Sequence, residues 1–232
     1  MHLFELHELI ENGENSSVEF KRRFSSAEKI AKEMIAFANT KGGMLLFGVD
    51  DNKTVVGVES EKGELELIDT VAKFYCEPEV KYEYEILHIY KKDVIIVSIP
   101  ESTNKPHTLI ENNSLVKSPQ NVTNGEPTNG NGLPRVYIRI KDKSVLASRE
   151  TIRILKRSNP NSPPMILTLG DKEKFLLDYL AKHERITLKE LRKQLNISER
   201  RASRILVNLV RAELIRLNPG FSGEKEDFYT LS

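Results

Sequence analysis

The sequence contains no tryptophan, a single cysteine and only four methionines. A single cysteine cannot form an internal disulfide, which excludes a disulfide-stapled secreted scaffold. No apolar run approaches the length of a membrane span, and the N-terminus lacks a basic stretch followed by an apolar one, as a secretory signal would have. We therefore expect a cytoplasmic protein that makes no membrane contact.

Several signatures of enzyme chemistry are also absent. No Gly-x-x-x-x-Gly-Lys-Ser/Thr loop is present to bind the phosphates of ATP. The five histidines do not follow zinc-ligand spacing, and no serine, histidine and aspartate order indicates a hydrolase triad. No cofactor is therefore expected, apart from Mg²⁺ or Mn²⁺ if the chain is a nuclease.

Charge is distributed unevenly along the 232 residues. Residues 1–134 carry 14 Lys/Arg against 22 Asp/Glu, and residues 135–232 carry 21 against 12, giving formal charges of −8 and +9. A basic half favours a polyanionic partner, because phosphates attract Lys and Arg and release counterions on binding. The alternative is that opposite charges hold the two halves, or two copies of the chain, together.

Residues 1–158 are expected to form an α+β domain with a mixed sheet and flanking helices. A capping-box sequence at 25–28, with apolar residues at spacings of three and four, predicts an amphipathic helix ending near Asn39. The apolar run Met44–Val49 predicts a buried strand. The other expected elements are a helix near 3–10, strands at 18–21, 54–58, 81–88, 92–99 and 136–140, and helices at 64–75 and 148–157.

The rest of the chain is expected to form a linker and a small second domain. The Asn-, Gly- and Pro-rich stretch 118–134 predicts a loop, and 159–167 predicts a linker. In the domain at 168–232, a helix is predicted at 171–183, and capping residues Thr187 and Ser198 begin two more. Two short strands at 214–217 and 227–231 would form the wing of a winged helix-turn-helix.

Acidic residues of the first domain point to metal chemistry. Carboxylate oxygens are the ligands that Mg²⁺ and Mn²⁺ prefer, and a bound ion could polarise a phosphodiester and lower the pKa of a bound water. A nearby lysine could stabilise charge on phosphorus. The candidate metal ligands are Glu14, Glu19 and Asp50, and Asp51 and Lys21 join them as candidate catalytic residues. The alternative is that these are ordinary structural or surface carboxylates.

The third helix of the second domain carries basic residues on the side away from its apolar ones. In a winged helix this side enters the major groove, where Arg pairs with guanine and Asn with adenine, while lysines approach phosphates. A solvated helix face or a dimer contact is the alternative. The predicted nucleic-acid-binding residues are Arg200, Arg201, Arg204, Asn208, Arg211, Lys193 and Lys225, with Arg139 of the first domain.

A series of short motifs stands in a distinctive order in the first domain: Glu14–Lys21, Phe37–Thr40 with the glycine pair 42–43, Phe47–Asp51, Val56–Val58, Lys105–His107 and Val136–Arg139. Together they resemble the Schlafen AlbA-like family, over roughly residues 3–157. The resemblance implies a DNA-binding or ATP-binding domain that is often joined to a C-terminal helix-turn-helix.

The same resemblance also implies an enzymatic alternative. Some animal Schlafen proteins are metal-dependent endoribonucleases of tRNA and rRNA, and their acids would correspond to Glu14, Glu19 and one of Asp50 or Asp51. Those enzymes carry two copies of the domain and this chain carries one, so a comparable cleft would require a homodimer.

Three hypotheses for function follow. The first is a nucleic-acid-binding protein that regulates transcription through DNA, as a homodimer, because helix-turn-helix readers commonly use two half-sites. The second is a divalent-metal-dependent endoribonuclease acting on structured RNA. The third is a protein-interaction module in which the oppositely charged halves bind a partner.

Overall fold

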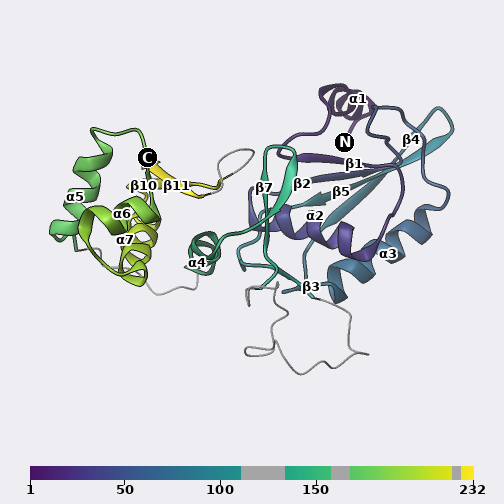
Figure 1. Ribbon diagram of the computed structural model, residues 1–232. Helices are drawn as coiled ribbons and strands as arrows, with labels where there is room; N and C mark the ends of the chain where they lie inside the picture. The colour runs from purple at the N-terminus through teal and green to yellow at the C-terminus, as the bar shows by residue number, and fades with distance from the viewer. Residues whose placement is uncertain (111–133, 158–167, 221–225) are drawn as a thin grey trace. The chain divides into compact units, whose positions relative to one another are not determined.

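The computed structural model describes residues 1–110, 134–157, 168–220 and 226–232 (Figure 1). They form two compact units, Met1–Leu146 and Ala147–Ser232. The predicted linker and almost all of the predicted loop at 118–134 lie outside the described residues. In the described ranges, no helix has both the length and the apolar character needed to cross a membrane.

The first unit is built on a four-stranded mixed sheet with the strand order β1-β2-β5-β4. The outer strand β1 is parallel to β2, and the other two neighbouring pairs are antiparallel. The strands are β1 (Val18–Lys21), β2 (Gly43–Phe47), β4 (Glu83–Ile89) and β5 (Lys92–Ile99). This mixed sheet with flanking helices confirms the predicted fold class.

Helices cover both faces of this sheet (Figure 1). Helices α2 (Ala27–Asn39) and α3 (Glu61–Phe74) pack on the face that carries Ile95 and Val97 of β5. The opposite face carries Val94 and Ile96, which belong to a second core cluster with α1 (Leu3–Asn12). Because residues alternate between the faces of a strand and both faces are covered here, β5 is apolar along most of its length.

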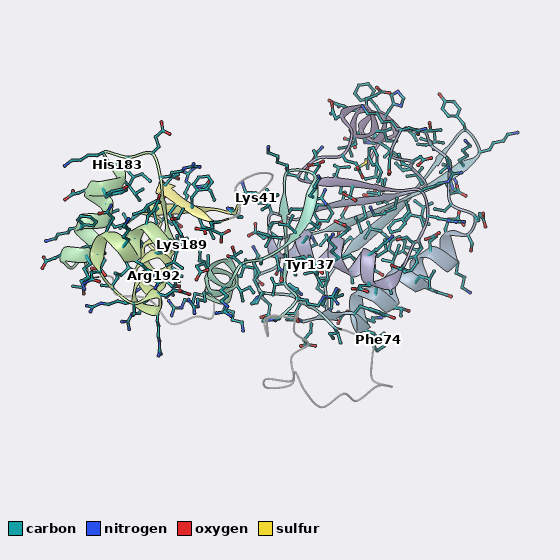
Figure 2. The ribbon with its side chains drawn as sticks, in the orientation of Figure 1. Lys41, Phe74, Tyr137, His183, Lys189 and Arg192 are labelled. Carbon is teal, nitrogen blue, oxygen red and sulfur yellow. The ribbon has the colours of Figure 1, made fainter. Side chains whose placement is uncertain are left out.

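The described part of the first unit also contains two two-stranded sheets. Strand β3 (Cys76–Glu77) pairs with β6 (Thr108–Leu109), and β7 (Tyr137–Ile140) pairs with β8 (Lys143–Leu146). The sequence did not predict β3 and β8. Strand β7 packs against α2, and Tyr137, labelled in Figure 2, belongs to the core between them.

The prediction of a strand at 54–58 is wrong. A single bridge between Val49 and Val55 replaces it, and the backbone N–H groups of Val56 and Gly57 both donate to the Gly48 carbonyl oxygen. Gly48 has φ +92°, and a Cβ there would lie 2.9 Å from the Asp93 carbonyl oxygen. Glycine is required at this position because both the backbone conformation and the space exclude a side chain.

In its described residues, the second unit has four helices and a three-stranded sheet with the order β10-β11-β9. Its core is formed by residues such as Leu206 and Tyr229, which are fully buried. The predicted helix order and the two later strands are confirmed, and the short β9 was not predicted. The elements are α4 (Arg149–Arg157), α5 (Asp171–Leu180), β9 (Ile186–Thr187), α6 (Leu188–Leu195), α7 (Glu199–Arg211), β10 (Ile215–Asn218) and β11 (Phe228–Leu231).

Helix α4 groups with the second unit, whereas the sequence placed it at the end of the first domain. It packs against α7, and Ile152 and Leu155 on its apolar side are buried. Its side chains also donate hydrogen bonds to Ser203 and Asn208 of α7. The predicted boundary at 158 followed the position of the Pro-rich linker, which says nothing about these packing contacts.

Candidate nucleic-acid interface

Helix α7 has one buried side and one basic side. The Ser198 side chain accepts a hydrogen bond from the Arg201 backbone N–H and caps the helix start, as predicted. Ala202, Leu206 and Leu209 are fully buried in the core of the second unit. Because these apolar residues recur with the period of a helix, the polar residues between them, such as Arg200 and Arg204, lie on the side of α7 that faces away from the core.

Three arginines on α7 are exposed. The structure gives Arg200, Arg201 and Arg204 no ion pair or hydrogen bond from their guanidinium groups to any described residue. Lys193, on the preceding helix α6, is also exposed. These four predicted residues therefore present charge that is free to meet an anion.

The other predicted residues of this face are placed differently. The Oδ1 atom of Asn208 accepts a hydrogen bond from Arg157 Nη1 at 3.2 Å, so this amide is already engaged by α4. Arg211 is half-buried in the last turn of α7. Lys225 lies outside the described residues. Helical periodicity within α7 carries no information about the α4 side chain that engages Asn208.

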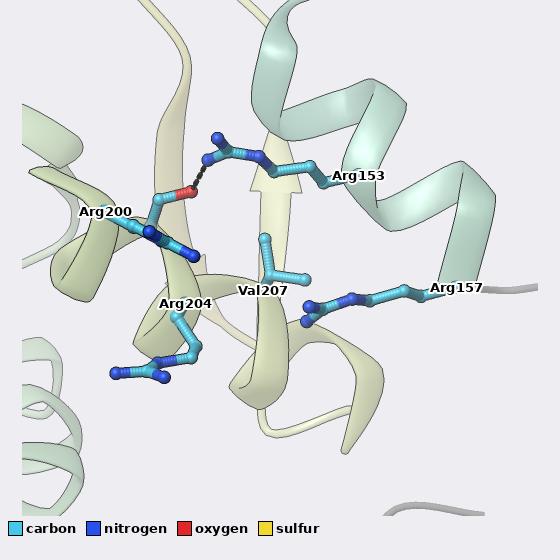
Figure 3. A pocket seen from close by; sticks show the side chains of 6 residues that line it. Arg153, Arg157, Arg200, Arg204 and Val207 are labelled. Atoms are coloured by element: carbon cyan, nitrogen blue, oxygen red, sulfur yellow. Dashed lines mark hydrogen bonds between the residues drawn. The ribbon is translucent and has the colours of Figure 1, made fainter. Parts of the chain in front are cut away.

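Two arginines that the sequence did not single out lie beside this face. Arg153 and Arg157 of α4 line a cavity of about 270 Å³ together with Arg200 and Arg204 of α7 (Figure 3). The only sequence signal for them was the basic character of the helix at 148–157. Four guanidinium groups from two helices thus surround one cavity in the second unit.

Arg139 does not belong to an exposed basic surface. Its side chain is only 2% exposed, and it forms ion pairs with Glu19 and Glu33, each with an N–O distance of 2.9 Å. Arg139 Nη2 also donates to the Asn15 carbonyl oxygen at 2.9 Å, and the guanidinium lies over the Phe37 ring. Because its charge is buried and paired, Arg139 does not lie on the exposed basic face where the sequence placed it.

Glu19 is the centre of a charged group in the first unit. One carboxylate oxygen pairs with Arg139 and the other with Lys21. Glu14 lies on the preceding loop, and its Oε1 accepts a hydrogen bond from the Phe20 backbone N–H at 2.8 Å. Burial raises the pKa of Glu14, and the charges of Glu19 and Asp51 act in the same direction. The predicted acids are therefore near enough to influence one another.

These acids do not converge as a set of metal ligands. Asp50 pairs with Arg22 at 2.9 Å, and Asp51 is exposed. Among the described residues, a different group brings histidine and carboxylate ligand atoms within 4.8 Å of one another, and it consists of Glu61, His88 and Asp93. The carboxylates proposed as metal ligands are instead each bound to a basic side chain or a backbone N–H.

The Phe37–Thr40 and Lys105–His107 motifs meet at a buried hydrogen-bond cluster. The Asn39 side chain donates to the carbonyl oxygens of His107 and Tyr137 at 2.9 Å and accepts from the His107 N–H at 2.8 Å. The His107 ring contacts Pro78 O and Ser102 Oγ, each at 2.7 Å, and burial lowers its pKa. His107 is therefore a buried structural residue.

Comparisons with known proteins bear on the first unit. The sequence pattern described as Schlafen, AlbA_2 matches residues 14–148. An uncharacterized ATP-binding protein of Ureaplasma parvum serovar 3 is 30% identical over 142 residues, and the match covers 50% of this chain and 39% of that protein. The chain therefore spans well under half the length of this curated relative.

Two solved structures are also similar. One is a protein from Corynebacterium diphtheriae, with a TM-score of 0.41, 19% identity and coverage of 72% of this chain and 33% of that chain. The other is the N-terminal domain of a protein related to the ATP-dependent DNA helicase RecG from Nitrosomonas europaea, with a TM-score of 0.39, 24% identity and coverage of 47% and 80%. Because the family pattern matches more than half of the residues, this chain belongs to the Schlafen, AlbA_2 family.

Proposed function

We propose that this protein binds nucleic acid through the basic face of α7, and that duplex DNA is its ligand. The observation that carries the proposal is the exposure of Arg200, Arg201 and Arg204 on one helix without an acidic partner among the described residues. Arginine forms bidentate hydrogen bonds with phosphate and with guanine. Unpaired arginines on one helix face could therefore contact both the backbone and the bases of a DNA duplex.

The architecture of the second unit supports the same function. Helices α6 and α7 follow one another closely, and β10 and β11 form an antiparallel pair after them. This order is that of a winged helix-turn-helix, in which the second helix of the motif reads the major groove. We infer that α7 is the reading helix and that the protein acts as a transcription regulator.

A homodimer is part of the proposal. Helix-turn-helix proteins commonly bind DNA as dimers that contact two half-sites. Their operators are therefore palindromic, and the two half-sites lie one helical turn, or a multiple of it, apart. Two chains per palindromic duplex are therefore expected, and the mass of the complex in solution checks this stoichiometry.

The family assignment supports a role with nucleic acid, and the endoribonuclease hypothesis remains an alternative within it. The contacts of Glu19 weigh against that alternative, because both carboxylate oxygens are paired with basic side chains. The curated relative is named an ATP-binding protein. This chain contains no Gly-x-x-x-x-Gly-Lys-Ser/Thr loop.

Fluorescence anisotropy with labelled duplexes tests the proposal. The full chain is compared with the double variant Arg200→Ala, Arg204→Ala and with a charge-matched control, Lys174→Ala, Lys182→Ala, whose residues are exposed and lie outside α7. The α7 variant is expected to weaken binding at least about tenfold, since each lost arginine contact is worth on the order of 1 kcal/mol or more. Equal binding by all three proteins would refute the proposed role of α7.

A further inference from the structure

Arginines are four of the six residues that line the cavity between α4 and α7. Its lining residues are Arg153, Arg157, Arg200, Ser203, Arg204 and Val207 (Figure 3). Two of the arginines belong to α4, which precedes the three helices of the helix-turn-helix region. The cavity volume of about 270 Å³ is ample for a single phosphate group.

The protein neutralises these four guanidinium groups only slightly. Arg153 donates to the Ser203 hydroxyl and lies 3.4 Å from a Glu150 carboxylate oxygen. Arg157 donates to the neutral Asn208 amide oxygen at 3.2 Å. Arg200 and Arg204 have no acidic partner among the described residues. Among the described residues, Glu150 is therefore the one carboxylate that forms an ion pair with any of these four arginines.

We propose that this cavity is a phosphate-binding site, which holds one phosphodiester of the nucleic-acid backbone beside α7. The inference rests on the proposed function and adds α4 to the binding surface. Clustered like charges repel one another, and a phosphate would relieve this repulsion while accepting hydrogen bonds from several guanidinium forks. Arginine also suits the site because its planar group matches the geometry of phosphate oxygens.

The site is expected to bind without regard to base sequence. Contacts to phosphates fix the position and orientation of a protein on the duplex, whereas contacts to base edges determine sequence preference. Arg153 and Arg157 belong to α4, which is not the helix proposed to read base edges. Arg153 and Arg157 should therefore strengthen binding to all duplexes equally and help set the register of α7.

The experiment measures the affinity of the full chain for two duplexes of unrelated sequence at several salt concentrations. The test variant is Arg153→Ala, Arg157→Ala, and the control is Arg149→Ala, Lys156→Ala, which removes the same charge from exposed positions of the same helix. The test variant is expected to lose about tenfold in affinity for both duplexes. Its plot of log affinity against log salt should be shallower by about 1, as expected for one lost phosphate contact.

A third variant, Arg153→Lys, Arg157→Lys, keeps the charge but removes the guanidinium forks. It should bind with intermediate affinity and retain most of the salt dependence, and its unfolding midpoint identifies any loss of fold. Wild-type affinity and salt slope in the alanine test variant would overturn the phosphate site while leaving DNA binding by α7 intact. If the wild-type chain binds neither duplex, the proposed function and the phosphate site are both wrong.

Discussion

Arg139 and Glu19 form a buried ion pair with an N–O distance of 2.9 Å between residues that are 120 positions apart in the sequence. The same guanidinium binds Glu33, which lies on α2. Strand β7, helix α2 and strand β1 are thus joined by one cation. The Glu19 carboxylate, which the sequence predicted to be a metal ligand, is one of the two acidic partners of this cation.

Arg139→Ala is expected to destabilise the first unit strongly. The change leaves the Glu19 and Glu33 carboxylates, each only 12% exposed, without their main cation. Removing one partner of a buried ion pair costs about 3–5 kcal/mol. Urea unfolding followed by circular dichroism measures the loss. Arg22→Ala is the control, because Arg22 is mostly exposed in its pair with Asp50 and should cost less than about 1 kcal/mol.

Glu19→Gln separates a structural role from a catalytic one. Because Glu19 pairs with Arg139 and Lys21, the change should lower the urea midpoint. Structured RNA incubated with wild-type protein and Mg²⁺ or Mn²⁺ should remain intact, and the variant should behave in the same way. Metal-stimulated cleavage of tRNA by the wild type that Glu19→Gln abolishes would establish the endoribonuclease alternative instead.

Asn39→Ala should be among the more damaging changes at a neutral residue. The Asn39 side chain makes three hydrogen bonds to the backbone of His107 and Tyr137, and the residue is 2% exposed. Unsatisfied buried groups cost about 1–3 kcal/mol each, so a loss of at least about 2 kcal/mol is expected. Asn12→Ala, at an exposed position, should change the free energy of unfolding by less than about 0.5 kcal/mol. Similar values for both variants would contradict the role given to Asn39.

The first unit should lose stability as the solution becomes acidic, in part through His107. Burial lowers the pKa of this imidazole below its usual value of 6.5, so the unfolded chain binds the proton more readily. The stability that His107 contributes is therefore complete above pH 6.5 and falls as the pH drops below it. An NMR titration, with the signal assigned by its loss in His107→Gln, should give a midpoint below 6.5. A midpoint above 6.5 would contradict the buried, neutral ring.

Local patterns predicted much of this fold. Strands β1 and β5 have the predicted bounds, because their apolar residues stand between clear turn signals. The caps at Thr187 and Ser198 were predicted from residue type and spacing, and both side chains accept the expected backbone hydrogen bond. The exposed α7 arginines followed from helical periodicity alone.

Long-range packing explains what the sequence could not predict. Arg139 looked like any basic residue on a strand, since its acidic partners lie 106 and 120 positions away. The arginines of α4 showed only that a helix was basic, and their position beside α7 depends on tertiary contacts. Whether an arginine is paired with an acid or left unpaired therefore depends on the fold and cannot be predicted from its local sequence.

The most direct test of the central proposal is to locate the binding surface. Backbone amide NMR shifts of the full chain are recorded while an unlabelled DNA duplex is added at low salt. The proposal predicts that the largest changes fall on α7, from Glu199 to Asn208, with smaller ones on α4. Changes confined to residues 1–146, or no changes at all, would contradict it.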